Sequence, residues 1–148
     1  MEIHHSKHHQ TYVTSYNNFS EKLQALQSAE ASSENLAEQM ALVPLLKFHG
    51  GGHVNHSLFW ENLAPKSAGG GTPPSGALGK AIDEQYGSLD TFKEKFNAAL
   101  AGIQGSGWAW LVQDIQTGSL AIIQLSNQDP VMAPFKPLLG IDAWEHAY

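Results

Sequence analysis

Apolar side chains recur at steps of three and four residues through the first part of the chain, a spacing typical of amphipathic helices. The pattern predicts one helix over residues 3–26 and a second over 33–63, with Ser33 as the N-cap of the second. Pro44 should end or restart the second helix, because proline has no amide hydrogen and clashes with the preceding turn. The two helices form the predicted N-terminal helical hairpin, residues 1–63.

Three consecutive glycines, Gly50–Gly52, lie inside the second predicted helix. Their low helix propensity alone would stop the helix at this point. The histidines and aromatic residues that follow, from His53 to Trp60, keep the helical spacing. We therefore expect the helix to continue past the glycines.

The second half has a different pattern and begins after a linker rich in glycine and proline, residues 64–76. Two short helices come first, with Ser88 as the N-cap of the second, and then the apolar period changes to that of strands around a hairpin turn at Thr117-Gly118. The predicted elements are helices over 77–86 and 89–101 and strands over 108–113, 120–125 and 138–143. The predicted fold class is α+β: the helical hairpin, then a mixed half, residues 77–148, with a small three-stranded antiparallel sheet and flanking helices.

Composition and charge exclude several classes of function. The 148 residues include no cysteine, which excludes a disulfide framework, thiolate zinc sites, iron–sulfur clusters and cysteine nucleophiles. The formal net charge is -6, and all eight basic residues are lysines, so no arginine can form the forked contacts that bind phosphates. No apolar run approaches the roughly 20 residues that cross a bilayer. We therefore expect neither nucleic acid nor a membrane as a partner.

Histidine is the unusual residue, because the chain has eight and most of them lie in short motifs. In the first motif, His4 and His8 share one face of the predicted helix, and Tyr12 extends that face by another turn. His5 and His9 share the neighbouring face. The motif suits metal ligation, and a solvated polar helix end is the alternative. An expression tag is a poor explanation, because the run of histidines is interrupted and merges into an amphipathic pattern.

Two further motifs add ligand types to the first. His53 and His56 lie one helical turn apart and precede two aromatic residues, which form either a pocket wall or a core stripe. Asp142 and His146 are four residues apart and would converge on one ion from a strand end and the turn that follows it. A capping aspartate with a nearby histidine is the alternative interpretation.

The combination of the three motifs is more informative than any one of them. Three separate regions offer imidazole nitrogens, one offers a carboxylate, and none offers sulfur. This donor set suits a redox-active iron or manganese ion better than a structural zinc ion, whereas calcium or magnesium would require more oxygen ligands. The residues therefore predict a mononuclear metal centre, with the metal between the two halves.

In order and spacing, these motifs resemble the iron/manganese superoxide dismutase family, manganese type, along almost the whole chain. The resemblance implies an enzyme that converts two superoxide anions and protons to dioxygen and hydrogen peroxide, with a manganese ion that cycles between +3 and +2. An iron-loaded version of the same enzyme is one alternative, and a non-catalytic metal-binding or interaction protein is the other. The motifs that carry the resemblance are His4–Tyr12, Gly50–Trp60, Gln104–Trp110, Asn127–Pro130 and Asp142–Tyr148.

The resemblance also implies roles for individual residues. His8 and Tyr12 would line the substrate entrance, and Gln128 would hydrogen-bond the solvent that the metal binds. Glu145 would pair with His146 of the partner subunit across a dimer. The implied metal ligands are His4, His56, Asp142 and His146, and the implied apolar wall around the ion consists of Phe48, Trp60, Trp108 and Trp144.

The same resemblance indicates the metal, and the net charge of -6 means that attraction of an anion must be local. The glutamine near the bound solvent comes from the second half in manganese-type relatives, where this chain has Gln128. In typical iron-type relatives it comes from the position that is Gly52 here, so manganese, one ion per subunit, is the expected cofactor. Lys7 is the candidate for local attraction of an anion, with a solvated surface lysine as the alternative.

Relatives extend past both ends of this sequence, so we expect a fragment that lacks both termini and has a truncated second half. The short connection between the first two helices resembles that of mitochondrial, tetramer-forming relatives. The expected assembly is a homodimer or homotetramer, and the expected location is the mitochondrial matrix, with the cytoplasm as the alternative.

Overall fold

The computed structural model describes all 148 residues, Met1–Tyr148. The contacts divide the chain into two compact units. Unit 1 consists of Met1–His56 together with Gln128–Pro130, and unit 2 consists of Ser57–Asn127 together with Val131–Tyr148. The segment Gln128–Pro130 therefore lies in the second half of the sequence but belongs to unit 1.

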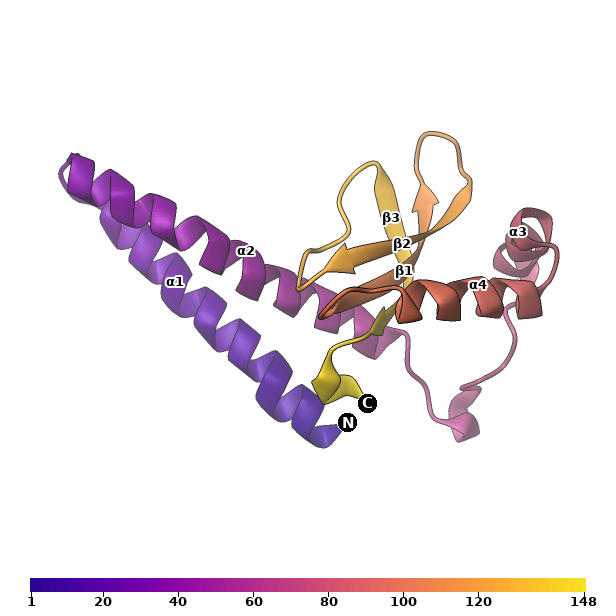
Figure 1. The fold of residues 1–148 in the computed structure, drawn as a ribbon. Coiled ribbons are helices and arrows are strands. Elements are labelled where there is room, and N and C mark those ends of the chain that lie inside the picture. The colour runs from indigo at the N-terminus through magenta and orange to yellow at the C-terminus, as the bar shows by residue number, and fades with distance from the viewer. The chain divides into compact units, whose positions relative to one another are not determined.

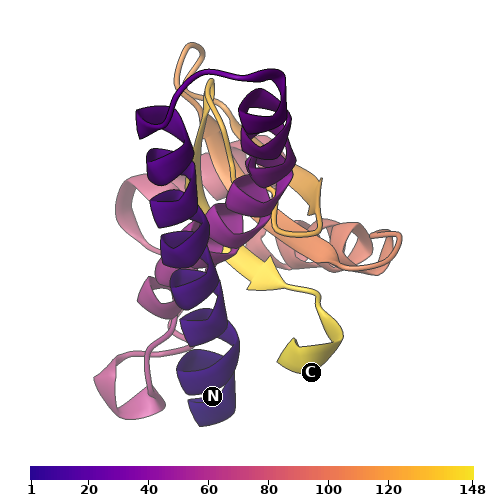
Figure 2. The same ribbon diagram turned by 90° about the vertical axis from the view of Figure 1, so that its left-hand side faces the viewer.

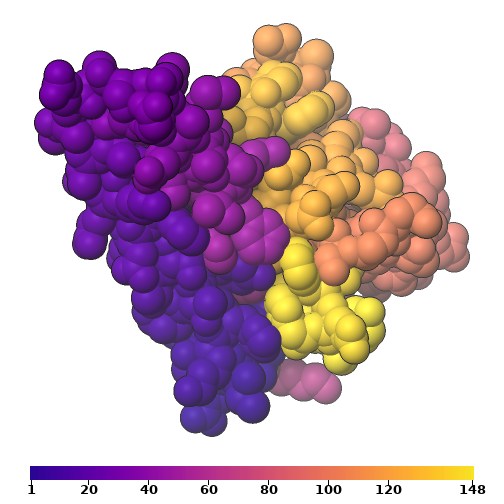
Figure 3. Space-filling model, turned by 60° about the vertical axis from the view of Figure 1, so that its left-hand side comes forward, coloured from indigo at the N-terminus to yellow at the C-terminus, as the bar shows by residue number.

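Unit 1 is a helical hairpin, as predicted (Figures 1 and 2). A π-helical stretch, η1 (His4–His9), leads directly into α1 (Gln10–Ser28), and α2 (Ser33–Glu61) begins after a short turn. The N-cap of α2 is Ser32 and not the predicted Ser33, because the Ser32 hydroxyl oxygen accepts a hydrogen bond of 3.0 Å from the backbone N–H of Asn35. At the turn, the two helices form one continuous surface (Figure 3).

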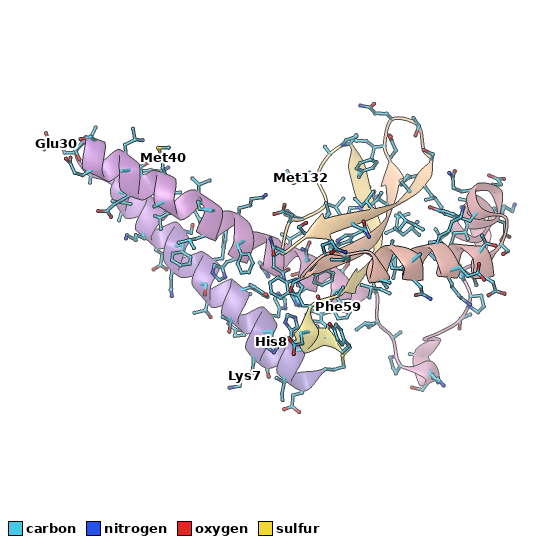
Figure 4. The ribbon with its side chains drawn as sticks, viewed as in Figure 1. Lys7, His8, Glu30, Met40, Phe59 and Met132 are labelled. Carbon is cyan, nitrogen blue, oxygen red and sulfur yellow. The ribbon has the colours of Figure 1, made fainter.

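Helix α2 passes through Pro44 without a break, so the predicted end or restart at this residue is wrong. A proline inside a helix leaves the carbonyl group four residues earlier without its usual partner. That residue is Met40, which is 66% exposed and projects from the outer side of the hairpin (Figure 4). Water can therefore satisfy the carbonyl group, and the packed hairpin holds the helix together across the proline.

The three glycines of α2 stay helical, as expected, and the structure supplies the reason. A Cβ atom at Gly51 would overlap the carbonyl oxygen of Gln128, and one at Gly52 would lie 2.6 Å from the ring of Tyr12. Only glycine allows both neighbours to approach the helix so closely. These tertiary contacts outweigh the low helix propensity of the glycine run.

Unit 2 combines two helices with a three-stranded antiparallel sheet, which confirms the predicted α+β class. The strand order is β2-β1-β3, and α4 packs against the sheet (Figure 1). The predicted N-cap of α4 is confirmed, since the Ser88 hydroxyl accepts a hydrogen bond of 3.1 Å from the Thr91 N–H. The elements are α3 (Gly76–Tyr86), α4 (Leu89–Ala101), β1 (Gly107–Asp114), β2 (Leu120–Ser126) and β3 (Phe135–Asp142), with short 3-10 helices η2 (Lys66–Ala68) and η3 (Glu145–Ala147).

The central strand β1 is buried on both faces and organises the core of unit 2. On one face Ala109 and Leu111 pack against side chains of α3 and α4. On the other face Trp108, Trp110 and Val112 form a second cluster that includes Phe59 and Trp144. No helix of the structure combines the length and the apolar character that a membrane span requires.

Candidate metal centre

Two of the predicted ligands, His4 and His56, come together inside unit 1. His4 lies on η1 and His56 on α2, and they are 6% and 0% exposed. Their Nε2 atoms are 3.0 Å apart, and the two rings meet edge to face. Two buried imidazoles thus direct the same ring nitrogen toward a common point.

The tautomer of His56 follows from its second hydrogen bond. Its Nδ1 lies 2.7 Å from the carbonyl oxygen of Gly52, one turn earlier on α2. A carbonyl oxygen only accepts, so Nδ1 carries the hydrogen and Nε2 of the neutral ring presents a lone pair. This arrangement is typical of metal-binding histidines, whose other nitrogen is oriented by a backbone carbonyl or a carboxylate.

The first histidine motif adopts a π-helix over its whole length, His4–His9. The ring of His4 meets that of His8 edge to face at 6.1 Å, and the ring of His5 meets that of His9 in the same way at 5.8 Å. The predicted pairing of the four histidines on two faces is therefore present. Segments of π-helix in proteins are frequent at functional sites. Figure 4 shows Lys7 and His8 at this same end of the hairpin.

Gln128 belongs to unit 1 and contacts Tyr12. Both side chains are buried, and the Gln128 Nε2 donates a hydrogen bond of 3.0 Å to the Tyr12 hydroxyl. Asn55 holds the Gln128 segment on α2, because its Nδ2 lies 3.3 Å from the carbonyl oxygens of both Gln128 and Asp129. An exposed ion pair of 2.8 Å between Lys47 and Asp129 adds a further link.

The other two predicted ligands, Asp142 and His146, come together inside unit 2. Asp142 ends β3 and is 5% exposed, whereas His146 lies on η3. The His146 Nε2 is 3.1 Å from the Asp142 Oδ2, and the Trp144 N–H donates a hydrogen bond of 2.9 Å to the Asp142 Oδ1. The strand end and the following turn therefore bring these two side chains together. Beside them, an open hollow of about 520 Å³ is lined by Ser106, Trp144, Glu145 and His146.

The four aromatic residues predicted for the apolar wall are divided between the two units. In unit 1, the ring of Phe48 meets that of Tyr12 edge to face at 5.9 Å. In unit 2, Trp108 is fully buried and lies opposite Asp142 in the register of β1 and β3. Trp144 stacks on the ring of His146 at 5.8 Å, and Trp60 contacts Phe59 at 5.0 Å.

Both halves of the chain match domains of one family. Residues 1–64 match the alpha-hairpin domain of the iron/manganese superoxide dismutases, and residues 74–148 match the C-terminal domain of the same enzymes. The chain belongs to this family.

Several manganese superoxide dismutases are about half identical to this chain. The mitochondrial manganese superoxide dismutase of Saccharomyces cerevisiae is 53% identical over 151 residues, which cover 99% of this chain and 65% of that protein. The mitochondrial enzyme of Schizosaccharomyces pombe is 54% identical over 149 residues, with coverage of 100% and 65%. Manganese superoxide dismutase 1 of Arabidopsis thaliana, also mitochondrial, is 51% identical over 152 residues, with coverage of 100% and 64%. The chain thus spans just under two thirds of the length of these relatives.

The superoxide dismutase fold also brings together a histidine pair that the motifs did not single out. The His9 Nε2 lies 2.9 Å from the His53 Nδ1, so these two histidines link the start of the hairpin to α2. Burial, together with the nearby imidazoles of His56, His53 and His5, lowers the pKa of His9 from 6.5 to about 4. At neutral pH His9 is therefore uncharged.

The sequence motifs gave no indication of two asparagines, one in each unit, that hold nearby backbone segments in place. Asn55 is fully buried and anchors the Gln128 segment, and Asn62 hydrogen-bonds the backbone of β3. Asparagine is common on protein surfaces and in turns, so composition carries no signal for such roles. Asn55 directly precedes His56, a predicted ligand, and this position is the one signal that could have drawn attention to it.

Proposed function

We propose that the full-length protein is a superoxide dismutase that converts two superoxide anions and two protons to dioxygen and hydrogen peroxide. The observation that carries this proposal is the paired convergence of ligands within each unit. The Nε2 atoms of His4 and His56 are 3.0 Å apart in unit 1, and Asp142 and His146 are 3.1 Å apart in unit 2. The names of the three relatives described above, which are manganese superoxide dismutases, support the same function.

The chemistry of these residues fits one manganese ion per subunit. His4, His56, Asp142 and His146 offer three imidazole nitrogens and one carboxylate oxygen, and three of the four side chains are buried. Nitrogen and carboxylate donors without sulfur suit manganese and iron. When bound, the metal supplies a site that accepts one electron from a first superoxide and returns it to a second.

The residues around the ligands supply protons and exclude water. Because the Tyr12 oxygen accepts a hydrogen bond from Gln128, the phenol directs its own hydrogen toward another acceptor. In this proposal Tyr12 and Gln128 hold a proton near the substrate, and His8 lines the entrance. The apolar wall of Phe48, Trp60, Trp108 and Trp144 keeps bulk water away, which strengthens every electrostatic interaction inside.

The space around Gly52 supports manganese over iron. The alternative, iron-type arrangement would place a glutamine at this position of α2. A Cβ atom there would lie 2.6 to 2.9 Å from three atoms of the Tyr12 ring, so a longer side chain requires Tyr12 to move. The buried Gln128, which already contacts Tyr12, fills that role from the loop instead.

The family membership also supports a proposal for the assembly and the location of the protein. We propose a homodimer or homotetramer in which exposed Glu145 pairs with His146 of the partner subunit. The relatives' names support the mitochondrial matrix as the location, with the cytoplasm as the alternative. Exposed Lys7, next to His8, is the proposed source of local attraction for the anionic substrate.

Metal analysis of the purified full-length protein, followed by a superoxide-consumption assay, tests the proposal. We expect close to one manganese ion per subunit and rapid superoxide consumption. Activity after reconstitution with iron but not with manganese would favour the iron-loaded alternative. Stoichiometric zinc without activity would contradict the enzyme and favour a non-catalytic metal-binding protein.

A further inference from the structure

Strand β3 lies at the edge of the sheet, and a side chain occupies the edge that no strand pairs with. Asn62, one residue beyond the end of α2, supplies this side chain. Its Oδ1 accepts a hydrogen bond of 2.9 Å from the Gly140 N–H, and its Nδ2 lies 3.4 Å from the Leu138 carbonyl oxygen. The amide group of Asn62 thus takes the place of a neighbouring strand's peptide group, donating to one residue of β3 and accepting from another.

The contact falls at the one irregularity in the pairing of β1 and β3. Leu111 lies opposite Leu139 and Val112 lies opposite Pro137, so Leu138 has no partner on β1. Such a bulge bends a strand and changes the direction of the side chains beyond it. Asn62 therefore hydrogen-bonds β3 at the bulge, which is the point where the strand changes direction.

Gly140 is held from a second side as well. It is buried, and a Cβ atom at this position would overlap the ring of Trp110, its partner on β1. The indole ring therefore packs directly on the backbone of Gly140, while Asn62 binds its N–H. Two residues later on the same face comes Asp142, opposite Trp108.

We propose that Asn62 is a positioning residue for Asp142, because it fixes β3 between the bulge at Leu138 and Gly140, two residues before this carboxylate. The proposal rests on the proposed function insofar as it takes Asp142 to be a manganese ligand. Asn62 itself does not contact the metal or the substrate. Its effect passes through the backbone from Gly140 to Asp142.

The test replaces Asn62 in the full-length, manganese-loaded protein and measures two quantities besides activity. Asn62→Leu keeps the number and branching of the side-chain heavy atoms and removes both hydrogen bonds. We expect faster hydrogen exchange of the Gly140 amide and manganese release into a chelator that is about tenfold faster, the lower end of the range for residues that orient metal ligands. Asn62→Asp still accepts from Gly140, so it should retain the protection of that amide and most of the slow release.

Two control variants separate positioning from general loss of stability. Asn97→Leu makes the same replacement at an exposed position on α4, and should leave both quantities unchanged. Leu42→Ala removes a buried side chain from α2 within unit 1, whereas Gly140 and β3 belong to unit 2. It should lower the denaturation midpoint at least as much as Asn62→Leu does. The rate of manganese release should nevertheless stay within about twofold of the wild-type rate, well below the tenfold increase expected when a residue that orients a ligand is lost.

The outcomes distinguish this inference from the proposed enzyme function. Unchanged manganese release and unchanged Gly140 exchange in Asn62→Leu would overturn the positioning role, even if the protein consumes superoxide. If Asn62→Asp releases manganese as fast as Asn62→Leu, the positioning role is overturned too, because the hydrogen bond from the Gly140 N–H would then have no effect on release. If Asn62→Leu releases manganese faster but the wild-type protein does not consume superoxide, the positioning role stands and the proposed enzyme function is rejected.

Discussion

The side-chain amide of Gln128 donates a hydrogen bond to the phenolic oxygen of Tyr12, although 116 positions separate the two residues in the sequence. The glutamine is fully buried and the tyrosine is 8% exposed. Tyr12 sits on the first helix of the hairpin, and Gln128 reaches it on a loop segment that Asn55 holds in place. Neither group is one of the four proposed ligands, so this pair offers a way to alter proton supply without removing the metal.

Replacing Gln128 with alanine should lower superoxide turnover 10- to 100-fold in the full-length protein and leave most of the manganese bound. The loss follows because Tyr12 no longer receives the hydrogen bond that orients its hydroxyl group. Turnover by stopped-flow absorbance and metal content on the same sample check the prediction. Gln116→Ala, at an exposed turn position, is the matched control, and an unaffected rate in Gln128→Ala would remove this glutamine from the proton network.

Replacing Gly51 with alanine should destabilise the protein by about 3 kcal/mol or more, because the new methyl group overlaps the backbone carbonyl of Gln128. Alanine favours a helix by about 1 kcal/mol over glycine, so the measured loss is a net value. Urea denaturation of the metal-free protein gives the free energy of unfolding. The control is Gly50→Ala, where the methyl group meets the ring of Tyr16, 38% exposed and able to move, and where we expect a change within about 1 kcal/mol. Equal losses in the two variants would contradict the close approach at Gly51.

The stability of the metal-free protein should fall below about pH 6.5, in part because of His49. Burial lowers the pKa of His49 in the folded state, and its Nδ1 is buried without a hydrogen-bond partner beside the rings of Phe19 and Tyr12. The unfolded chain therefore binds a proton more readily, so this contribution is fully present above the unfolded pKa and is lost as pH falls through it. Because the residue is only partly buried, we expect a small loss of stability.

Denaturation midpoints at pH 7 and pH 5 check this sign. His49→Gln, which cannot take up a proton, should show a smaller difference between the two midpoints than the wild-type protein. A larger midpoint at pH 5 than at pH 7 for the wild-type protein would contradict the assigned direction.

Removing a proposed ligand should abolish manganese binding, whereas removing a nearby histidine should not. We expect His56→Ala to lose more than about 100-fold in manganese affinity, beyond the range for residues that only orient ligands. His5→Ala, which is exposed on η1, should retain close to one ion per subunit. Isothermal titration of the metal-free protein measures both. Equal affinities in the two variants would exclude His56 as a ligand.

The local signals in the sequence predicted most elements of the fold. Ser88 caps α4 as expected, and the turn at Thr117-Gly118 joins β1 to β2, with Gly118 at a φ of 76°. Such features depend on a few neighbouring residues, so a single sequence is enough to predict them. Pro44 was misread because the local rule does not include the exposure of the carbonyl it leaves unpaired.

Features that depend on distant segments could not be predicted in the same way. The motifs indicated His56 and Gln128, but nothing in them showed that Asn55 would anchor the loop or that Asn62 would bind the edge of β3. The bulge at Leu138 is likewise a property of strand pairing and not of composition. In each case the partner is far away in the sequence, and the interaction exists only after the chain has folded.

The membership of Gln128–Pro130 in unit 1 constrains how the two halves of this protein can be exchanged between relatives. A chimaera joined at the glycine- and proline-rich linker would combine the hairpin of one protein with the loop of another. Such a hybrid keeps the packing of the Gln128 segment on α2 only if the hairpin has glycine at position 51. It keeps the hydrogen bond to Tyr12 only if the loop has a side-chain amide at position 128. The linker is therefore a convenient place to cut the gene, but it does not separate two parts that can vary independently.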